Sequence, residues 1–355
     1  MAYRPDLAGV LARYRAFYAG RGCRVLVHVG APLGITVAGP VLGDYAFPEG
    51  YLDYLRAHLD AFEQSSLARL EQGLDDDSVP SVTTSLYGIA LHSAFAAGEP
   101  IFGESTSWSH PVLTDWRQLD GLTVDPTNRW FRLLADTARY LASRARGKYA
   151  VCPHNSYGPM DLANALRGNE LFVDLYDRPA QVHRLLDWCT GAIITLEEAL
   201  RAIGGNPYGG LSTWAAWVPG NAVFLSEDAV NLCRPETCRD FALPYTQRLL
   251  DHFGGGMIHT HALGLHCLPA LGALRGLRLL QVSDDPNRPR PVTCLDRLLA
   301  ACPGVPLMLA CTPDELRELA QEPPPGRLLL STRAQTVEEG RELIALARAW
   351  GGGLD

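Results

Sequence analysis

Two histidines spaced two residues apart are the side chains of this sequence best suited to chemistry. His259 and His261 follow the apolar residues Met257 and Ile258, a pattern typical of a short buried strand. Side chains two residues apart on a strand lie on the same face, about 7 Å apart. The two imidazoles can therefore hold one metal ion or one anionic substrate. The alternative is a hydrogen-bonded pair inside a polar barrel end.

Other polar and metal-binding side chains also follow apolar runs. Asp284 and Asp285 come directly after 277–283, and Cys311 ends 305–311. In α/β barrels, the loops at the carboxyl ends of the strands carry the active site. We therefore expect a polar cluster at one end of the fold, formed by His28, Thr83, Thr84, His154, Asn155, Trp214, Trp217, His259, His261, Asp284, Asp285, Cys311, Ser331 and Arg333.

Alternating strands and helices must position these residues. Apolar runs typical of buried parallel strands occur at 24–29, 79–84, 149–152, 211–217, 256–261, 277–283, 305–311 and 326–331. Helical patterns occupy 51–70, 128–146, 179–202 and 293–301, and two more begin after Thr312 and Thr336. Residues 97–125 are expected to form an irregular loop over one end. We predict an α/β fold: a single (β/α)8 TIM-barrel domain over residues 1–355 with an N-terminal helical extension.

Composition narrows the class of protein. The 355 residues are 47% hydrophobic and 20% charged, with a net charge of -8 and a pI near 5.7. Such a chain lacks the basic face of a nucleic-acid-binding protein, and no apolar run reaches the roughly 18 residues of a membrane span. Nine scattered cysteines are typical of reduced thiols. We predict a cytoplasmic protein that acts on a small molecule and binds neither nucleic acid nor membrane. A homodimer is possible, and the sequence leaves the oligomeric state open.

Several segments resemble the uroporphyrinogen decarboxylase superfamily. They are GPMDLANALRG at 158–168, LFVDLYDRP at 171–179, and the residues from Arg234 to Tyr245, followed by Gly254, Gly255 and His259. Residues 305–316 and 326–344 resemble the last two strand-helix units of that superfamily. The resemblance is clearest over 75–350, and it implies a (β/α)8 barrel.

The resemblance favours one branch of that superfamily. True uroporphyrinogen decarboxylases begin with an arginine-rich substrate-binding segment and carry an aspartate that contacts the pyrrole nitrogens. This chain has HVGAPL at 28–33 in the early segment, and Tyr87 lies near the place of the aspartate. A substrate with many carboxylates needs cationic partners. The chain is therefore more similar to the corrinoid- and thiol-dependent methyltransferases.

Methyltransferases of that branch hold zinc with a His-x-Cys pair and a distant cysteine. His259 matches the first ligand, His261 replaces the cysteine, and STR at 331–333 stands where the distant cysteine would be. The resemblance therefore implies zinc held by His259, His261 and a third ligand. Cys311 and Asp284 are the best candidates for that ligand, and Asp285 is a further alternative.

Zinc-dependent methyl transfer is the leading hypothesis. Zinc would lower the pKa of a thiol, and the thiol or another small-molecule acceptor would take a methyl group from a corrinoid, on a possible partner protein, or from another donor. Asp284 and His154 are further candidate catalytic residues. The candidate substrate contacts are His28, Tyr87, Asn155, Tyr157, Trp214, Trp217 and Arg333.

Two other functions stay open at this point. One is a metal-free decarboxylase or lyase acting on a small carboxylated substrate. In it, His259 and His261 would act as acid and base, and Asp284 would tune an imidazole. The other is a non-catalytic protein that binds a ligand or a corrinoid partner. Metal content separates these hypotheses.

Overall fold

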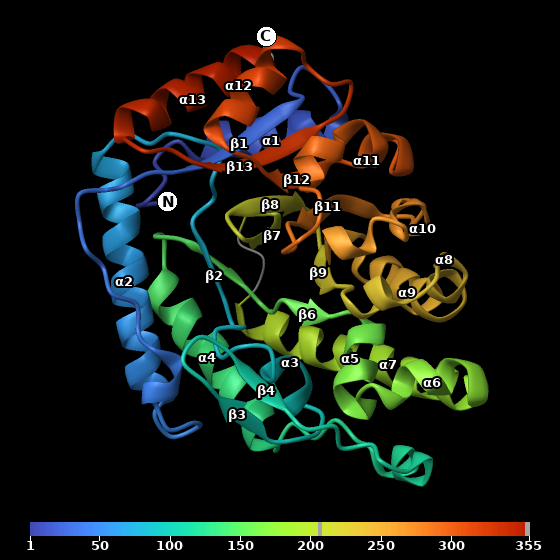
Figure 1. Cartoon of the computed structure of the whole chain (residues 1–355). Helices are drawn as coiled ribbons and strands as arrows, with labels where there is room; N and C mark the ends of the chain where they lie inside the picture. Colours follow the sequence, from blue (N-terminus) through green and yellow to red (C-terminus); the bar gives the residue numbers. More distant parts are fainter. Residues whose placement is uncertain (205–207, 352–355) are drawn as a thin grey trace.

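A parallel seven-stranded sheet forms the centre of the molecule (Figure 1). The computed structural model describes residues 1–204 and 208–351. The strand order is β1-β13-β12-β11-β10-β9-β6. Their bounds are β1 Val25–Gly30, β6 Ser156–Tyr157, β9 Val223–Ser226, β10 Gly256–His261, β11 Leu277–Ser283, β12 Leu307–Ala310 and β13 Leu328–Arg333. β2 (Ser81–Thr83) and β5 (Ala150–Cys152) form a separate parallel pair, and β5 leads along the chain into β6.

The segment before β2 contacts the far edge of the main sheet. The backbone N–H of Asp77 donates to the carbonyl of Val27 in β1, and the Asp77 carboxylate accepts from the N–H of Val27. The Asp76 carboxylate likewise accepts from the N–H of Val29. The strands therefore curve around a shared interior, an arrangement consistent with a TIM-like α/β fold.

Helices surround the strands on the outside (Figure 1). The longer ones are α1 Leu7–Ala19, α2 Tyr51–Glu71, α4 Arg129–Ala145, α5 Pro159–Arg167, α6 Glu170–Asp177, α7 Pro179–Gly204, α9 Leu243–Phe253, α11 Leu295–Ala301, α12 Pro313–Gln321 and α13 Val337–Gly351. The shorter ones are α3 Leu91–Ala94, α8 Pro235–Thr237, α10 Leu268–Gly272, the 3-10 helices η2 Trp116–Gly121 and η3 Ala229–Leu232, and the π-helix η4 Cys238–Ala242. α1 precedes the first strand, so the predicted N-terminal helix is confirmed.

Most of the predicted elements of the second half are confirmed. The strand predicted at 277–283 coincides with β11, and Thr312 forms the predicted cap by accepting a hydrogen bond from the N–H of Glu315. The expected loop at 97–125 instead contains the antiparallel pair β3 Pro100–Phe102 and β4 Ser107–Ser109, and also η2. The prediction for that segment was wrong, because Gly103 and its neighbours allow the chain to turn back on itself.

The strand predicted at 211–217 is a hairpin that lies outside the main sheet. β7 Gly210–Thr213 and β8 Ala216–Pro219 pair antiparallel. The turn residues Trp214 and Ala215 have φ values of 47° and 60°, and this left-handed backbone reverses the chain. The parallel strand of this region is β9, which follows the hairpin and was not predicted.

Two layers of side chains line one face of the main sheet. One is apolar and packs with α1 and the β7–β8 hairpin; it contains Leu26, Phe224, Met257, Leu279, Met308 and Leu329. Two residues further along the same strands, and therefore on the same face, stand His28, Ser226, His259, Gln281, Ala310 and Ser331. All of these residues except Ala310 are polar, and they lie at the carboxyl ends of the strands. His28, His259 and Ser331 are the members of the predicted polar cluster among them.

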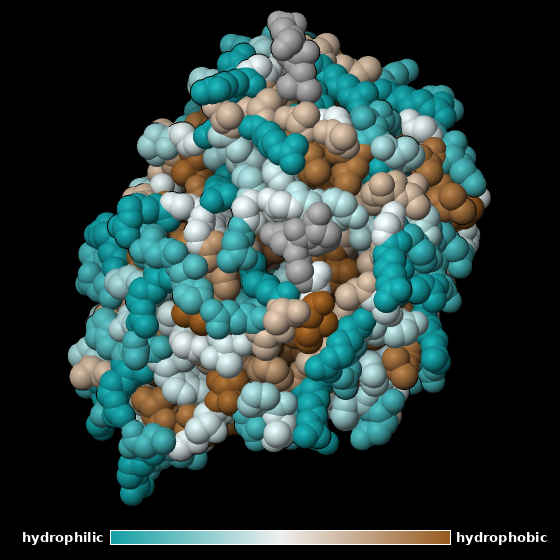
Figure 2. Space-filling view, turned by 180° about the vertical axis from the view of Figure 1, so that it is seen from behind, coloured by the Kyte–Doolittle hydropathy of each residue, from teal (hydrophilic) through white to brown (hydrophobic). Residues whose placement is uncertain are grey.

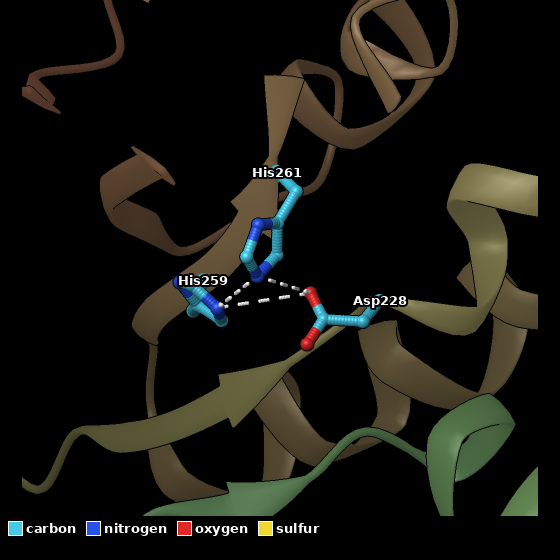
Figure 3. A group of neighbouring side chains, drawn as sticks. All are labelled: Asp228, His259 and His261. Carbon is cyan, nitrogen blue, oxygen red and sulfur yellow. Dashed lines mark hydrogen bonds and ion pairs between the residues drawn. The ribbon is translucent and has the colours of Figure 1, made fainter. Parts of the chain in front are cut away.

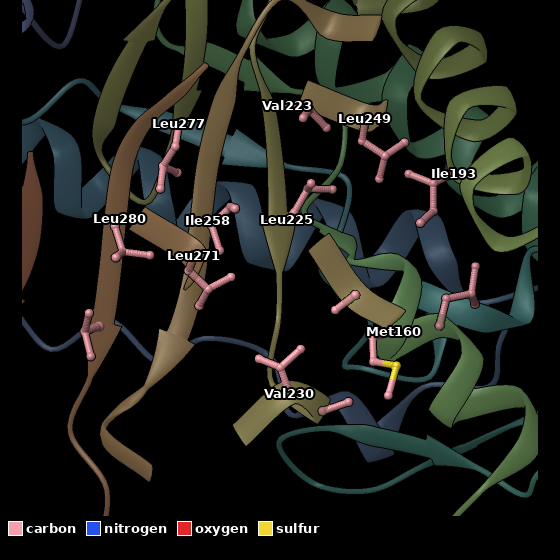
Figure 4. Packing of buried hydrophobic residues seen from close by; sticks show 14 of the residues in the cluster. Met160, Ile193, Val223, Leu225, Val230, Leu249, Ile258, Leu271, Leu277 and Leu280 are labelled. Carbon is pink, nitrogen blue, oxygen red and sulfur yellow. The ribbon is translucent and has the colours of Figure 1, made fainter. Parts of the chain in front are cut away.

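The opposite faces of the strands pack against the helices. Ile258, Leu225 and Leu280 meet a layer that includes Leu249 of α9 and Ile193 of α7 (Figure 4). On the surface drawn in Figure 2, hydrophobic residues occur as small groups between hydrophilic ones. Among the described helices, none is both long enough and apolar enough to span a bilayer. All nine cysteines are free thiols, as expected.

Candidate metal centre

Three side chains from neighbouring strands converge at the carboxyl end of the sheet. His259 and His261 stand on β10, and Asp228 follows β9 directly (Figure 3). The Nε2 atoms of the two imidazoles are 3.2 Å apart. Oδ1 of Asp228 lies 3.7 Å from Nε2 of His259 and 3.8 Å from Nε2 of His261. The two histidines therefore face one point, as predicted, and a carboxylate completes a group of three.

The separations of these three atoms suit a tetrahedral metal ion. Zinc bonds to nitrogen and oxygen of about 2.0–2.1 Å place ligand atoms roughly 3.3–3.4 Å apart at tetrahedral angles. The distances of 3.2, 3.7 and 3.8 Å lie within a few tenths of an ångström of that value. Oδ1 of Asp228 is inaccessible to water and has no hydrogen-bond partner among the described residues. A cation bound by all three atoms would satisfy this buried oxygen.

Hydrogen bonds on the far side of each ring fix which nitrogen is free to bind a cation. Nδ1 of His259 contacts Oε1 of Gln281, whose amide nitrogen donates to Ser283. Nδ1 of His261 donates to Oδ1 of Asp285 over 2.9 Å. With both Nδ1 atoms protonated, both Nε2 atoms carry lone pairs, and they point toward each other. This pattern of an imidazole held by a carboxylate or amide is typical of metal-binding histidines.

The end of β9 is folded around the carboxylate of Asp161 in α5. This carboxylate accepts from the backbone N–H groups of Asp228 and Ala229, at 3.0 and 2.6 Å. The Ser226 hydroxyl lies 2.9 Å from Asp161 and 2.8 Å from Oδ2 of Asp228. These contacts hold Asp228 so that Oδ1 turns to the histidines. Glu227 points the other way, into the core, where it contacts Thr246.

Burial and like charge shift the pKa values around this centre. Burial lowers the pKa of His259, so its ring stays neutral and able to bind a cation at neutral pH. Burial, and then the neighbouring charge of Asp228, raise the pKa of Asp161 to about 7. Burial also raises the pKa of Glu227 well above its usual range. A bound cation would relieve the repulsion between the carboxylates.

Trp214, at the tip of the β7–β8 hairpin, covers one side of the centre. Its ring meets His259 edge to face, with the ring centres 5.0 Å apart, and it also packs on Phe224. Trp217 does not reach the centre, because its side chain is buried and packs against Tyr14 of α1. Of the two predicted tryptophan contacts, the structure brings only Trp214 to the histidines.

The remaining predicted residues lie outside the group of three. His28 is buried, and its Nε2 lies 3.0 Å from the Tyr14 hydroxyl. His154 is buried against Ser85, and the side chain of Asn155 accepts from Thr213. Of the predicted substrate contacts, Tyr87 is buried and its hydroxyl forms a hydrogen bond with the Thr137 hydroxyl. The Tyr157 ring stacks on His92, and Arg333 is exposed at the end of β13.

The proposed third ligands Asp284 and Cys311 are not members of the group of three. Nε of Arg290 donates to the Asp284 carboxylate over 2.9 Å, so this side chain is engaged in an ion pair. Burial raises the pKa of Cys311 to about 12, which disfavours the thiolate that a metal needs. Asp285 is near the centre, but it contacts the Nδ1 side of His261. The third side chain that the structure groups with the two histidines is Asp228.

The sequence does contain a signal for Asp228. The apolar run at 222–225 ends in Ser226, Glu227 and Asp228, just as the run at 277–283 ends in Asp284 and Asp285. Assigning a parallel strand to 211–217 hid this signal. Comparison of the chain with protein-family models and with curated proteins gives no match. The arguments for function therefore come from the geometry of the centre, together with the resemblance described above.

Proposed function

We propose that this protein is a metal-dependent enzyme that holds a divalent cation, zinc in the first instance, between Asp228, His259 and His261. The observation that carries the proposal is the buried Oδ1 of Asp228, which faces two imidazole nitrogens oriented as acceptors. Three protein ligands with an open fourth position are typical of catalytic zinc.

We further propose that the reaction is methyl transfer from a corrinoid or another donor to a thiol or small-molecule acceptor. A divalent cation at this position supplies Lewis-acid chemistry that lowers the pKa of a thiol or hydroxyl. Asp285 and Gln281 keep the imidazoles in the required tautomer, and Trp214 excludes water from one side of His259. The resemblance supports methyl transfer and closure of the strands into a single (β/α)8 domain, in which Asp77 and Val27 would mark the closing seam.

The three proposed ligands offer two nitrogen atoms and one oxygen atom, and no thiolate. Two imidazoles and one carboxylate give a bound divalent ion one more positive charge than a set with two thiolates. That charge makes the ion a stronger Lewis acid. The same donor set also suits Fe(II), so the metal preference itself is part of the test.

A metal-free lyase is the second candidate function. The Asp285–His261 hydrogen bond supports it, because a carboxylate that orients an imidazole is also the arrangement of a general base. Asp161, with its pKa raised to about 7, is a nearby proton donor. In this function the two imidazoles share a proton instead of a metal ion.

Metal content, paired with a methyl-transfer assay, tests the proposal. We expect about one zinc per chain after purification in zinc, and loss of that zinc in Asp228→Ala and in His259→Ala. Asp284→Ala and Cys311→Ala serve as matched controls that keep the zinc. Methylcobalamin and a small thiol serve as the donor and acceptor probes. A zinc-free protein with lyase turnover would favour the second candidate. A zinc-free protein with no turnover would leave a binding function.

A further inference from the structure

A cavity of about 420 Å³ opens beside the metal centre. It lies between β4, α5 and η3, and Asp228 belongs to both the cavity and the centre. The other lining residues that matter here are Ile89, Trp108, Tyr157 and Asp161. A volume of this size accommodates a small organic molecule. A ligand in the cavity would therefore lie next to the metal ligand Asp228.

The charged groups that line this cavity are all negative. Asp161 and Asp228 are its two charged residues, and the polar remainder consists of serine hydroxyls, the Tyr157 hydroxyl and the amides of two asparagines. Asp285 adds a third carboxylate behind His261. Among the described residues, no lysine, arginine or histidine lines the cavity, so an anion would find no cationic side chain on its walls. A positively charged ligand would instead face carboxylates and polar groups.

Two aromatic rings, those of Trp108 and Tyr157, lie among the aliphatic side chains that line the cavity. The Trp108 ring packs over Gly103, where an added Cβ would lie 2.9 Å from a ring carbon, and the side chain is 46% exposed. His92 supports the Tyr157 ring by stacking on it, with centres 4.8 Å apart. Within 1–204 and 208–351, arginines stack on Trp116, Trp130 and Trp217, but Trp108 has no such partner. A tryptophan face is the ring that binds organic cations best.

We propose that this cavity binds a small organic cation with an alkylated ammonium head, placed between Trp108 and the two carboxylates. Because the cavity adjoins Asp228, we propose that this cation is the substrate of the metal centre. Its role as a substrate rests on the proposed function. The binding itself depends on the cavity alone. A polycarboxylated ligand, such as a tetrapyrrole, does not suit these walls.

Choline and its neutral isostere 3,3-dimethylbutan-1-ol, titrated into the zinc-loaded full-length protein by calorimetry or NMR, test this proposal. We expect choline to bind at least tenfold more tightly than the isostere. Trp108→Leu should weaken choline binding roughly three- to thirty-fold, the range of a cation–π contact, while Trp108→Tyr should restore most of it. Tyr176→Ala, at an exposed position on α6, is the control and should not change it.

Equal binding of the two probes, no binding of choline, or an unchanged affinity in a folded Trp108→Leu variant would each overturn the proposal. Circular dichroism of each variant establishes that it is folded. The zinc content of the same samples is measured separately. Choline binding by a protein that holds no zinc would contradict the proposed metal-dependent function and support the cation site. Zinc binding without a preference for choline would contradict the cation site and support the metal-dependent function.

Discussion

Replacing Asp285 by asparagine tests how the metal centre is built, because this residue contacts a proposed ligand from behind. One carboxylate oxygen accepts from Nδ1 of His261 over 2.9 Å, and the other accepts from the N–H of Leu263 over 2.7 Å. An amide has one acceptor and one donor. In either orientation of Asp285→Asn, therefore, an NH2 group faces another N–H group.

The size of the effect follows from this mismatch. If the amide nitrogen faces His261, the ring changes its tautomer and presents Nε2–H to the cation. If the amide oxygen faces His261, the tautomer survives but the negative charge is lost. Loss of a group that hydrogen-bonds to a metal-binding histidine lowers metal affinity roughly 10- to 100-fold, or by about 1.4–2.8 kcal/mol. The metal-free protein should also lose about 1 kcal/mol of unfolding free energy, because a partly buried donor loses its acceptor.

Competitive titration of zinc against a chromophoric chelator measures the first quantity, and urea unfolding of the metal-free protein measures the second. Asp284→Asn is the matched control, because its carboxylate pairs with Arg290 and does not contact either histidine. Its zinc affinity should stay within about twofold of the wild type. Equal losses in the two variants, or wild-type affinity in Asp285→Asn, would show that His261 is not a ligand held by Asp285.

Three further predictions concern stability. Burial lowers the pKa of His92 to about 4. The unfolded chain therefore takes up the proton first as the pH falls below about 6.5. His92→Gln should reduce the stability lost between pH 7.5 and 5 by about 2 kcal/mol in urea unfolding. Ala215→Gly removes the left-handed strain at φ 60° and should raise the unfolding free energy by about 0.5–1 kcal/mol, whereas Ala216→Gly in β8 should lower it. Gly158→Ala should cost about 2–3 kcal/mol, because the new methyl group would lie 2.4 Å from the Glu227 carboxyl; Gly121→Ala, with no atom within 4 Å, should be tolerated.

The elements that the sequence predicted best are those whose pattern is local. β10 and β11 contain the short apolar pairs Met257–Ile258 and Leu279–Leu280, and α12 begins with a proline and a capping box that need no tertiary contact to be recognised. The spacing of His259 and His261 places both rings on one face of any strand. The convergence of the two imidazoles could therefore be predicted before a single long-range contact was known.

The third member of the centre required knowledge of which strand lies beside β10. That neighbour is β9, and its register places Ser226 against His259. A parallel strand was predicted at 211–217 and none at 223–226, so the neighbour of β10 was not identified. Left-handed backbone at two non-glycine residues cannot be read from composition, so the hairpin was missed. Asp228 was missed with it.

The same hairpin connects conformational strain to the chemistry of the site. Turns with two left-handed residues favour asparagine and glycine, and a tryptophan there costs roughly 1 kcal/mol or more. Trp214 is also 42% exposed, so burial recovers only part of that cost. The left-handed turn places the Trp214 ring in T-shaped contact with both His259 and Phe224. Backbone strain that the surrounding fold maintains beside a candidate site is typical of functional sites. We therefore interpret the strained turn as a means of keeping water away from one side of His259.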